Sequence, residues 1–542
     1  MNLNLPDKLR DLGVLAIPMD LLPLDLAGIG KEFPHMYWKY GQKILAAARI
    51  IGPNPNLHAV YVTNFRCGPD SFISKFFGRV LGEPYLTIEI DQHSSDVGAI
   101  TRCEAFIDSF RSIRTEGRRK ARGEDLFFDI RRVGRALKVY VPHMDDHNLV
   151  FAAMLRANGI DAEGLPMSDR ESAELGRKFT TGKECYPCIL TTGDIVKKTR
   201  EPGFDPQHSA FFMPEADGPC RFGQYHKCHR MILDDLGLED VPLVVLDQGT
   251  DFASQLEAFG ADFYRACWDL VVIVDYMKKM VLQTRPYEVN AGETDRVYRE
   301  CLAELALVGE RRGDIYAKAA EARDRLAAVP VRPAERRPLI GIVGEIYVRS
   351  NEFSNGYLVR KLERMGAEVV MPSLQEWLNY IAHERREVCW QKGEIWGFVK
   401  EWLAEFVARW DEGRAGRIFR GAVRHMAREA ASADVIRLGS EYIDPTIKGE
   451  AILSIGRAVE YAEHGLNGVV NVVPFGCMPG AIVNGLLEKF RRDHGGIPLL
   501  KMDYDGTEQT AEETLREAFV HQARQHMEGA QEGEMSEARY ER

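Results

Sequence analysis

The chain contains 542 residues, of which 45% are hydrophobic and 28% charged, and its formal net charge is -11. This length exceeds what one hydrophobic core supports, so about three α/β units are expected. The negative charge argues against nucleic acid and other polyanions as partners. The start, MNLNLP, lacks the basic and apolar regions of a signal peptide, and no apolar run approaches the roughly 20 residues that cross a bilayer. Ten cysteines in such a chain indicate reduced thiols or metal ligands, and a cytoplasmic location.

The first 125 residues predict an α/β unit in which strands alternate with helices. The segment FRCGPDSF, with Cys67, follows the second strand, and DQHSSD, with His93, follows the third. Alternation of this kind is typical of a doubly wound parallel sheet. The expected elements are strands at 12–18, 58–64 and 85–90 and helices at 37–50 and 97–110. The basic run at 114–124 is expected to be an exposed loop; the alternative is a docking patch for an acidic partner.

The remaining chain predicts two more α/β units separated by helices. Residues 126–250 form the second unit, with strands beginning at 139 and at 242, and 251–335 form a helical segment that ends in the linker PVRPAERRP. Residues 336–525 form the third unit, which is mostly helical between 374 and 432. Its expected strands lie at 339–345, 368–371, 467–473 and 497–502. The polar tail, 526–542, is expected to be frayed or disordered.

Four cysteines lie where a loop gives way to a helix: Cys67, Cys185, Cys220 and Cys477. Pro187 in GKECYPC suits a first helical turn. A cysteine at a helix N-terminus lies in a positive field, which favours the thiolate that ligates metal. Loops at the carboxyl ends of parallel strands gather around ligands. We therefore expect the four cysteines to converge on a soft-metal site, zinc or iron–sulfur, with iron–sulfur favoured.

Alternatives exist for these cysteines. Cys188 and Cys228 are further candidate ligands, or else pack in helices. Zinc sites bring ligands in close pairs, but only Cys185 and Cys188 are so spaced. A thioredoxin-like Cys185-x-x-Cys188 pair would leave the other loop cysteines unexplained. The cysteines in helical runs are expected to be small packing residues: Cys103, Cys267, Cys301 and Cys389.

Two weaker candidate sites contain residues with possible catalytic roles. His93 could donate protons, although a locally hydrogen-bonded loop histidine is the simpler interpretation. Glu345 and Arg349 follow the strand LIGIVGE and could hold a substrate or phosphate group. Helix capping and structural ion pairing explain this second pair equally well.

Six segments stand out along the chain: FRCGPDSF, IDQHSSDVGAITR, GKECYPC with TTGD, GPCRFGQY, GEIYVRSNEFSN and PFGCMP. Together they resemble the activase-related proteins allied to 2-hydroxyacyl-CoA dehydratases, including D-component-like and double-cubane cluster proteins. The resemblance implies a [4Fe–4S] or double-cubane [8Fe–9S] cluster, reduced by an ATP-hydrolysing activase. It also implies that Cys67, Cys185, Cys220 and Cys477 are ligands. Cys188 and Cys228 are further candidate ligands, but the resemblance does not imply that they bind the cluster.

The chain has no G-x-x-x-x-G-K-[ST] loop and no evident ATPase segment, so we expect a separate activase. By the resemblance, we expect the chain to begin partway through the longer family module, which favours a companion subunit or a homo-oligomer. The expected function is an iron–sulfur component that passes low-potential electrons to a small or CoA-linked substrate. The alternatives are a 2-hydroxyacyl-CoA dehydratase subunit and a structural zinc or assembly subunit.

Overall fold

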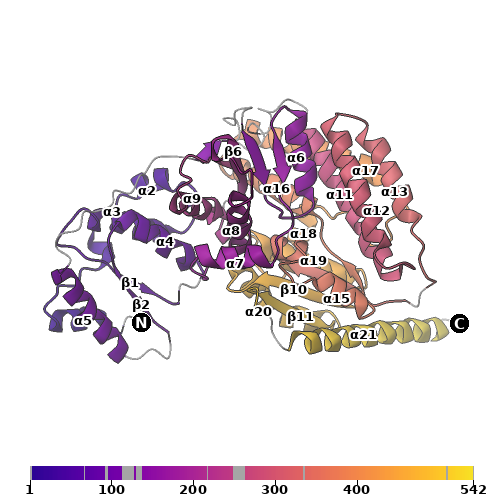
Figure 1. Cartoon of the computed structure of the whole chain (residues 1–542). Coiled ribbons are helices and arrows are strands. Elements are labelled where there is room, and N and C mark those ends of the chain that lie inside the picture. The colour runs from indigo at the N-terminus through magenta and orange to yellow at the C-terminus, as the bar shows by residue number, and fades with distance from the viewer. Residues whose placement is uncertain are drawn as a thin grey trace.

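The protein has an α/β fold built on three sheets, and every strand pair within them is parallel. This confirms the predicted fold class. The computed structural model describes residues 3–65, 68–91, 96–112, 127–129, 137–216, 218–247, 255, 263–333, 336–507 and 511–540. In Figure 1 the N-terminal unit lies at one end of the molecule, and the other two sheets lie beside the long helices of the middle segment.

The N-terminal unit contains a two-stranded sheet, β1-β2, against which helices pack. The strand predicted at 12–18 is wrong: this stretch is extended chain outside any sheet, and Leu15 is 81% exposed. The apolar residues there do not meet a neighbouring strand in the described chain. The elements are α1 Leu5–Asp11, η1 Met19–Leu21, α2 Leu26–Glu32, α3 Lys39–Ile51, β1 Val60–Thr63, α4 Asp70–Leu81, β2 Leu86–Glu89 and α5 Asp96–Ser112.

The second unit contains a five-stranded sheet in the order β3-β7-β6-β4-β5. Its centre includes β6, which the sequence analysis did not predict. Gly193 lets α7 and α8 pack closely, because an added Cβ would lie 1.7 Å from the Ser172 carbonyl oxygen. The elements are β3 Phe127–Asp129, β4 Lys138–Val141, α6 His147–Ala157, β5 Ala162–Gly164, α7 Arg170–Phe179, α8 Tyr186–Thr199, η3 Pro206–His208, β6 Ser209–Glu215, η4 Arg221–Gln224, α9 Tyr225–Asp235 and β7 Leu243–Asp247.

Helices follow the second sheet, as expected for this stretch. They are α11 Phe263–Thr284, η5 Arg285–Tyr287, α12 Glu293–Glu310 and α13 Ile315–Ala327. Together with α6 they enclose one hydrophobic core that also takes in Ala408 and Ala415 of the later helix α17. The helical segment therefore packs against both neighbouring units.

The third unit contains a four-stranded sheet in the order β11-β10-β8-β9. Its last helix, α21, runs through the tail expected to be frayed; Phe519, Val520 and Ala523 anchor it in the core. The elements are β8 Leu339–Gly344, α14 Ile346–Ser350, α15 Leu358–Arg364, β9 Glu368–Val370, α16 Leu374–Gln391, α17 Ile395–Ile418, α18 Ser432–Gly439, α19 Glu450–Glu463, β10 Gly468–Pro474, α20 Met478–Asp493, β11 Leu499–Tyr504 and α21 Glu512–Tyr540.

A buried ion cluster joins the helical segment to the third unit. Arg457 of α19 forms ion pairs with Glu376 of α16 and with Glu429. It also pairs with Glu460 on its own helix, and all four side chains are buried. Lys279 of α11 pairs with Glu429 at 2.7 Å. Because buried carboxylates need compensating charge, Arg457 is central to this junction.

Replacing Arg457 with Met should lower the free energy of unfolding by about 3–5 kcal/mol, because it leaves buried carboxylates without their shared cation. Denaturant unfolding followed by circular dichroism measures this change. The matched control is Arg170→Met, which breaks the exposed ion pair with Glu174 and should cost less than about 1 kcal/mol. Equal effects of the two substitutions would show that the cluster does not stabilise the junction.

Candidate functional site

Three of the predicted cysteine ligands converge on one small cavity. Cys185, Cys220 and Cys477 line it and are the N-cap residues of α8, η4 and α20. Gly68 and Pro69 line the same cavity. Cys67 itself lies outside the described residues, so its predicted place at this cavity stays a prediction. The predicted convergence of loops from separate units is therefore present for the three described cysteines.

A backbone N–H group in the first turn of the following helix acts to lower the pKa of each of these thiols, although none of the three side chains forms a capping hydrogen bond. These N–H groups belong to Cys188 for Cys185, Phe222 for Cys220 and Gly480 for Cys477. Helix N-termini carry unpaired N–H groups that can stabilise negative charge in this way.

The buried guanidinium of Arg221 connects the cysteine loops. Its Nη1 lies 3.2 Å from Ser71 Oγ of α4 and 3.5 Å from the Lys183 carbonyl oxygen. Its Nη2 donates to the carbonyl oxygens of Phe475, at 3.4 Å, and Gly476, at 3.0 Å. Arg221 therefore holds together the loops that contain Cys185, Cys220 and Cys477, and the helix that follows Cys67. The sequence analysis missed this role, although GPCRFGQY contains the residue.

Arg221 carries a buried positive charge without a carboxylate partner among the described residues. Burial lowers the pKa of Arg221, whereas negative charge on Cys185, Tyr225, Cys477 and Cys220 would outweigh this cost and raise it. Burial in turn raises the pKa of all three thiols, outweighing the attraction of the cation and the helix N–H groups. The free thiols are thus protonated, contrary to the expected thiolates, and a bound cationic metal would be needed to deprotonate them.

Cys188 and Cys228 do not line this cavity. Both are fully buried in the hydrophobic core, where each thiol shifts the pKa of the other, raising that of Cys188 and lowering that of Cys228. Lys75 Nζ lies 3.9 Å from Cys228 Sγ. Packing in the core accounts for both residues, which was the alternative considered for them.

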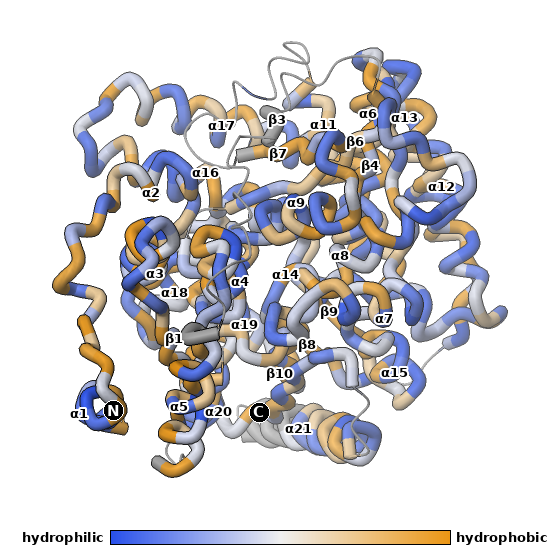
Figure 2. Tube along the Cα trace, turned by 60° about the vertical axis from the view of Figure 1, so that its left-hand side comes forward, coloured by the Kyte–Doolittle hydropathy of each residue, from blue (hydrophilic) through white to orange (hydrophobic). Residues whose placement is uncertain are grey.

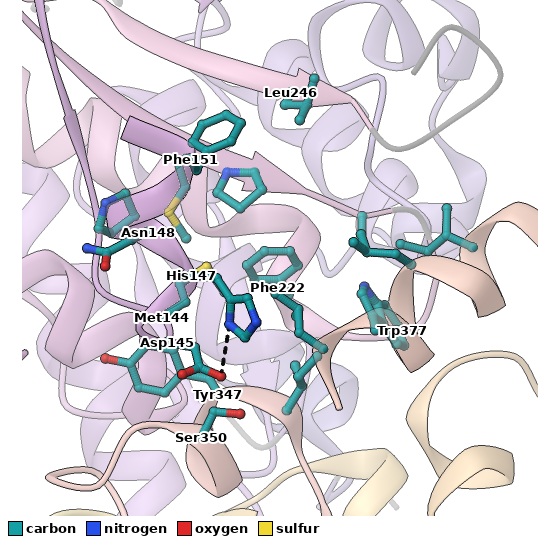
Figure 3. A pocket seen from close by; sticks show the side chains of 18 of the residues that line it. Met144, Asp145, His147, Asn148, Phe151, Phe222, Leu246, Tyr347, Ser350 and Trp377 are labelled. Atoms are coloured by element: carbon teal, nitrogen blue, oxygen red, sulfur yellow. Dashed lines mark ion pairs between the residues drawn. The ribbon is translucent and has the colours of Figure 1, made fainter. Parts of the chain in front are cut away.

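A second, larger cavity of about 270 Å³ adjoins the first. Both cavities are lined by Pro219, Cys220, Tyr225 and Glu345. The lining of the large cavity is mainly apolar and aromatic, and Figure 3 shows Phe151, Phe222 and Trp377 among its side chains. Its walls come from the second sheet, from helices α11 and α16 and from the loop after β8, so no single stretch of sequence reveals it. Its aromatic members include Phe151, Phe212, Phe222, Tyr264, Trp268 and Trp377.

Glu345 lies in the wall shared by the two cavities. Its Oε2 accepts a hydrogen bond from the Val348 N–H at 2.8 Å, capping α14. Burial, together with the nearby carboxylate of Glu450, raises the pKa of Glu345 to about 8. Burial also raises the pKa of Glu450 to about 6. Two carboxyl groups so close together cannot both ionise easily, so this wall retains a proton at neutral pH.

His147 adds a positive charge to the large cavity. Its Nδ1 lies 3.3 Å from Asp145 Oδ2, an ion pair drawn in Figure 3, and its Nε2 lies 3.1 Å from Asp275 Oδ1. These carboxylates raise the pKa of His147 to about 9 despite burial. The histidine is therefore charged, and its charge is already balanced within the protein.

Structural roles account for the other residues considered near Glu345. Arg349 is buried and pairs with Glu376 at 3.4 Å, and it is absent from the lining of both cavities. Asn351 and Asn355 accept hydrogen bonds from the N–H groups of Ser354 and Leu358, each at 3.0 Å. His93 and the basic run at 114–124 lie outside the described residues, so their predicted roles stay predictions.

Within the described chain, no group of three or more His, Cys, Asp or Glu side chains is arranged so that it could hold a metal ion. Yet three thiols surround one cavity, each with a helix N–H group, beside a cation that lacks a carboxylate partner. Thiolate ligands with N–H hydrogen bonds to sulfur are the environment in which proteins bind iron–sulfur clusters.

Neither protein-family models nor curated proteins provide a match for this chain. None of the described helices combines the length and apolar character required to cross a membrane.

Replacing Glu345 with Gln should change how stability depends on pH. A carboxyl group whose pKa is raised by folding stabilises the protein below its unfolded pKa, and this contribution is lost as pH rises toward about 8. The variant should therefore gain stability relative to the parent between pH 5 and 9, by a few kcal/mol at about 1.4 kcal/mol per pKa unit. Thermal unfolding of the metal-free protein across this range measures the difference.

The control for this experiment is Glu488→Gln, which removes a largely exposed carboxylate. Its stability should follow that of the parent at every pH. If the stability of Glu345→Gln and that of the parent changed with pH in the same way, the pKa of Glu345 would not be raised.

Proposed function

We propose that the chain is the redox component of an ATP-driven, low-potential system and holds a [4Fe–4S] or double-cubane [8Fe–9S] cluster on Cys67, Cys185, Cys220 and Cys477. The observation that carries this proposal is the buried charge of Arg221, which faces three thiols and lacks a carboxylate partner in the described chain. An anionic, thiolate-ligated cluster would provide the missing counter-charge. Such a cluster, when bound, supplies one-electron reduction.

The large cavity would hold the substrate beside the cysteines. Its described cations, His147 and Arg385, are already paired with carboxylates, and Glu345 and Glu450 add acidic groups. Binding a phosphate or carboxylate there would place unbalanced negative charge in an apolar environment. The cavity therefore favours an uncharged, apolar molecule, or the acyl part of a CoA thioester whose phosphates remain outside.

Glu345 would serve as a hydrogen-bond or proton donor to this substrate. It lines both cavities and keeps its proton near neutral pH. Tyr225 also lines both, and its hydroxyl lies 2.6 Å from Cys185 Sγ. The two residues thus place groups that are protonated at neutral pH in the wall that both cavities share.

The electrons would come from a separate ATP-hydrolysing activase in the cytoplasm, because the sequence shows no phosphate-binding loop. The basic run at 114–124 remains a hypothetical docking patch. A 2-hydroxyacyl-CoA dehydratase subunit is the enzymatic alternative, and it would use the same cavities for a thioester. The alternative outside enzymology is a structural zinc or assembly subunit, for which only Cys185 and Cys188 have the close spacing typical of zinc ligands.

Protein purified anaerobically with iron supplied should contain iron and acid-labile sulfide, and should lose its visible absorption in air. Cys185→Ala and Cys220→Ala should each remove most of the iron, because each deletes a sulfur from the cavity. Cys301→Ala is the control, since this buried cysteine belongs to the helical core. Stoichiometric zinc without iron in the parent protein would overturn the proposal.

The charge preference of the large cavity can be tested with benzamide and benzoate, which are nearly identical in shape. Calorimetry at neutral pH should show benzamide binding at least about tenfold more tightly, a difference of about 1.4 kcal/mol. Val271→Trp should fill the cavity and abolish binding, whereas Val97→Trp, an exposed helical position, should not. Equal affinities, or unchanged binding to Val271→Trp, would contradict the assignment. These binding affinities can be measured whether or not the protein contains iron.

A further inference from the structure

Helix α17 has its polar side turned toward the protein. The buried carboxylate of Glu401 pairs with Arg385 of α16 at 3.2 Å. The buried carboxylate of Asp411 forms a two-pronged contact with Arg265 of α11, at 2.6 and 2.7 Å. A helix that covers the core of a monomer normally turns its apolar side inward and its charged side to water. Along this part of α17 the arrangement is reversed.

The outward side of α17 is an apolar stripe. Between residues 395 and 410, Lys400 is the single exposed charged residue, and Trp396 is 86% exposed. The other exposed side chains recur three or four residues apart, so they form one continuous strip along the helix. The stripe consists of Ile395, Trp396, Val399, Trp402, Leu403, Phe406, Val407 and Trp410. Figures 1 and 2 both place α17 on the opposite side of the molecule from α21.

The area of the stripe approaches what a stable protein interface needs. With about 150–250 Å² for each aromatic side chain, the exposed parts of its four aromatic residues alone provide on the order of 400–600 Å². A standard interface uses about 800 Å² of each partner, and the four aliphatic residues add to the aromatic area. Apolar patches larger than a few hundred Å² usually mark an interaction site. Tryptophan is also enriched among the residues that dominate binding energy.

The charges around the stripe decide between possible partners. A membrane-surface helix carries lysines and arginines on its polar face, and anionic lipids attract basic proteins. Here Glu401 and Asp411 of the polar face are paired inside the protein, one exposed cation, Lys400, lies beside the stripe, and the chain has a net charge of -11. A nearly uncharged stripe can pack on an identical stripe without much like-charge repulsion, and two-fold symmetry brings the same surface of each copy together.

We propose that two copies of this chain associate through α17, with the apolar stripe of one copy packed on that of the other. Association removes the exposed tryptophans from water. This interface is independent of whether the cysteine cavity holds a cluster.

Analytical ultracentrifugation of the full chain at micromolar concentrations tests the proposal. The parent protein should sediment as a dimer. Trp402→Glu places a charge near the middle of the stripe, and it should weaken association at least about 30-fold, the loss caused by replacing a central interface residue. Leu307→Glu is the control: it introduces the same charge at an exposed leucine of α12 and should leave the dimer intact.

Phe406→Ser is a milder second variant, and circular dichroism checks that each variant folds. It should also weaken the dimer. A monomeric parent protein would overturn the proposal, as would a dimer that survives both stripe substitutions in folded protein. Monomeric parent protein that sediments with phosphatidylserine-containing vesicles would instead assign the stripe to a membrane surface.

Discussion

The arrangement of the candidate site depends on the buried guanidinium of Arg221. Its donors reach backbone carbonyls in two cysteine loops and a hydroxyl on α4, while Cys220 precedes it in the chain. A buried cation is costly unless negative charge or dipoles surround it, and here the described partners are neutral oxygens and protonated thiols. The same residue therefore fixes the geometry of the loops and creates a demand for an anion among them. A thiolate-ligated cluster would meet both conditions.

The sequence predicts much of this local structure because each cysteine occurs with its own helix-start signals. Pro187 and Pro479 follow Cys185 and Cys477 by two residues, which marks each cysteine as a residue just before a first helical turn. Contacts between residues that are far apart in the sequence have no such local signal. The contacts of Arg221 reach between 38 and 255 residues along the chain, and the large cavity combines side chains from the second sheet, α11 and α16. The strand predicted at 12–18 is wrong for the opposite reason. The local composition favours a strand, but no strand in the described chain pairs with this stretch.

The two cavities differ in polarity, and the difference has a chemical consequence. The cysteine cavity faces helix N–H groups and a cation, which favour negative charge. The large cavity is apolar, and its ionic groups are already neutralised by one another or, at Glu345, by a retained proton. Negative charge is thus favoured in the cysteine cavity, whereas a charged ligand is disfavoured in the large cavity. An uncharged ligand could approach Cys220 through this wall without displacing an ion pair.

Helix α17 connects the apolar stripe to this second cavity. It packs on α16 and on α11, and both of these helices line the cavity through Trp377 and Trp268. The contact with α11 includes a hydrogen bond from Trp268 Nε1 to the Ala408 carbonyl oxygen at 3.0 Å. Because tightly packed helices shift together rather than deform independently, a partner bound on the outward face of α17 would restrict the movement of two cavity walls. Association through the stripe would then hold the large cavity in one shape, and would do so without touching the cysteine loops that Arg221 secures.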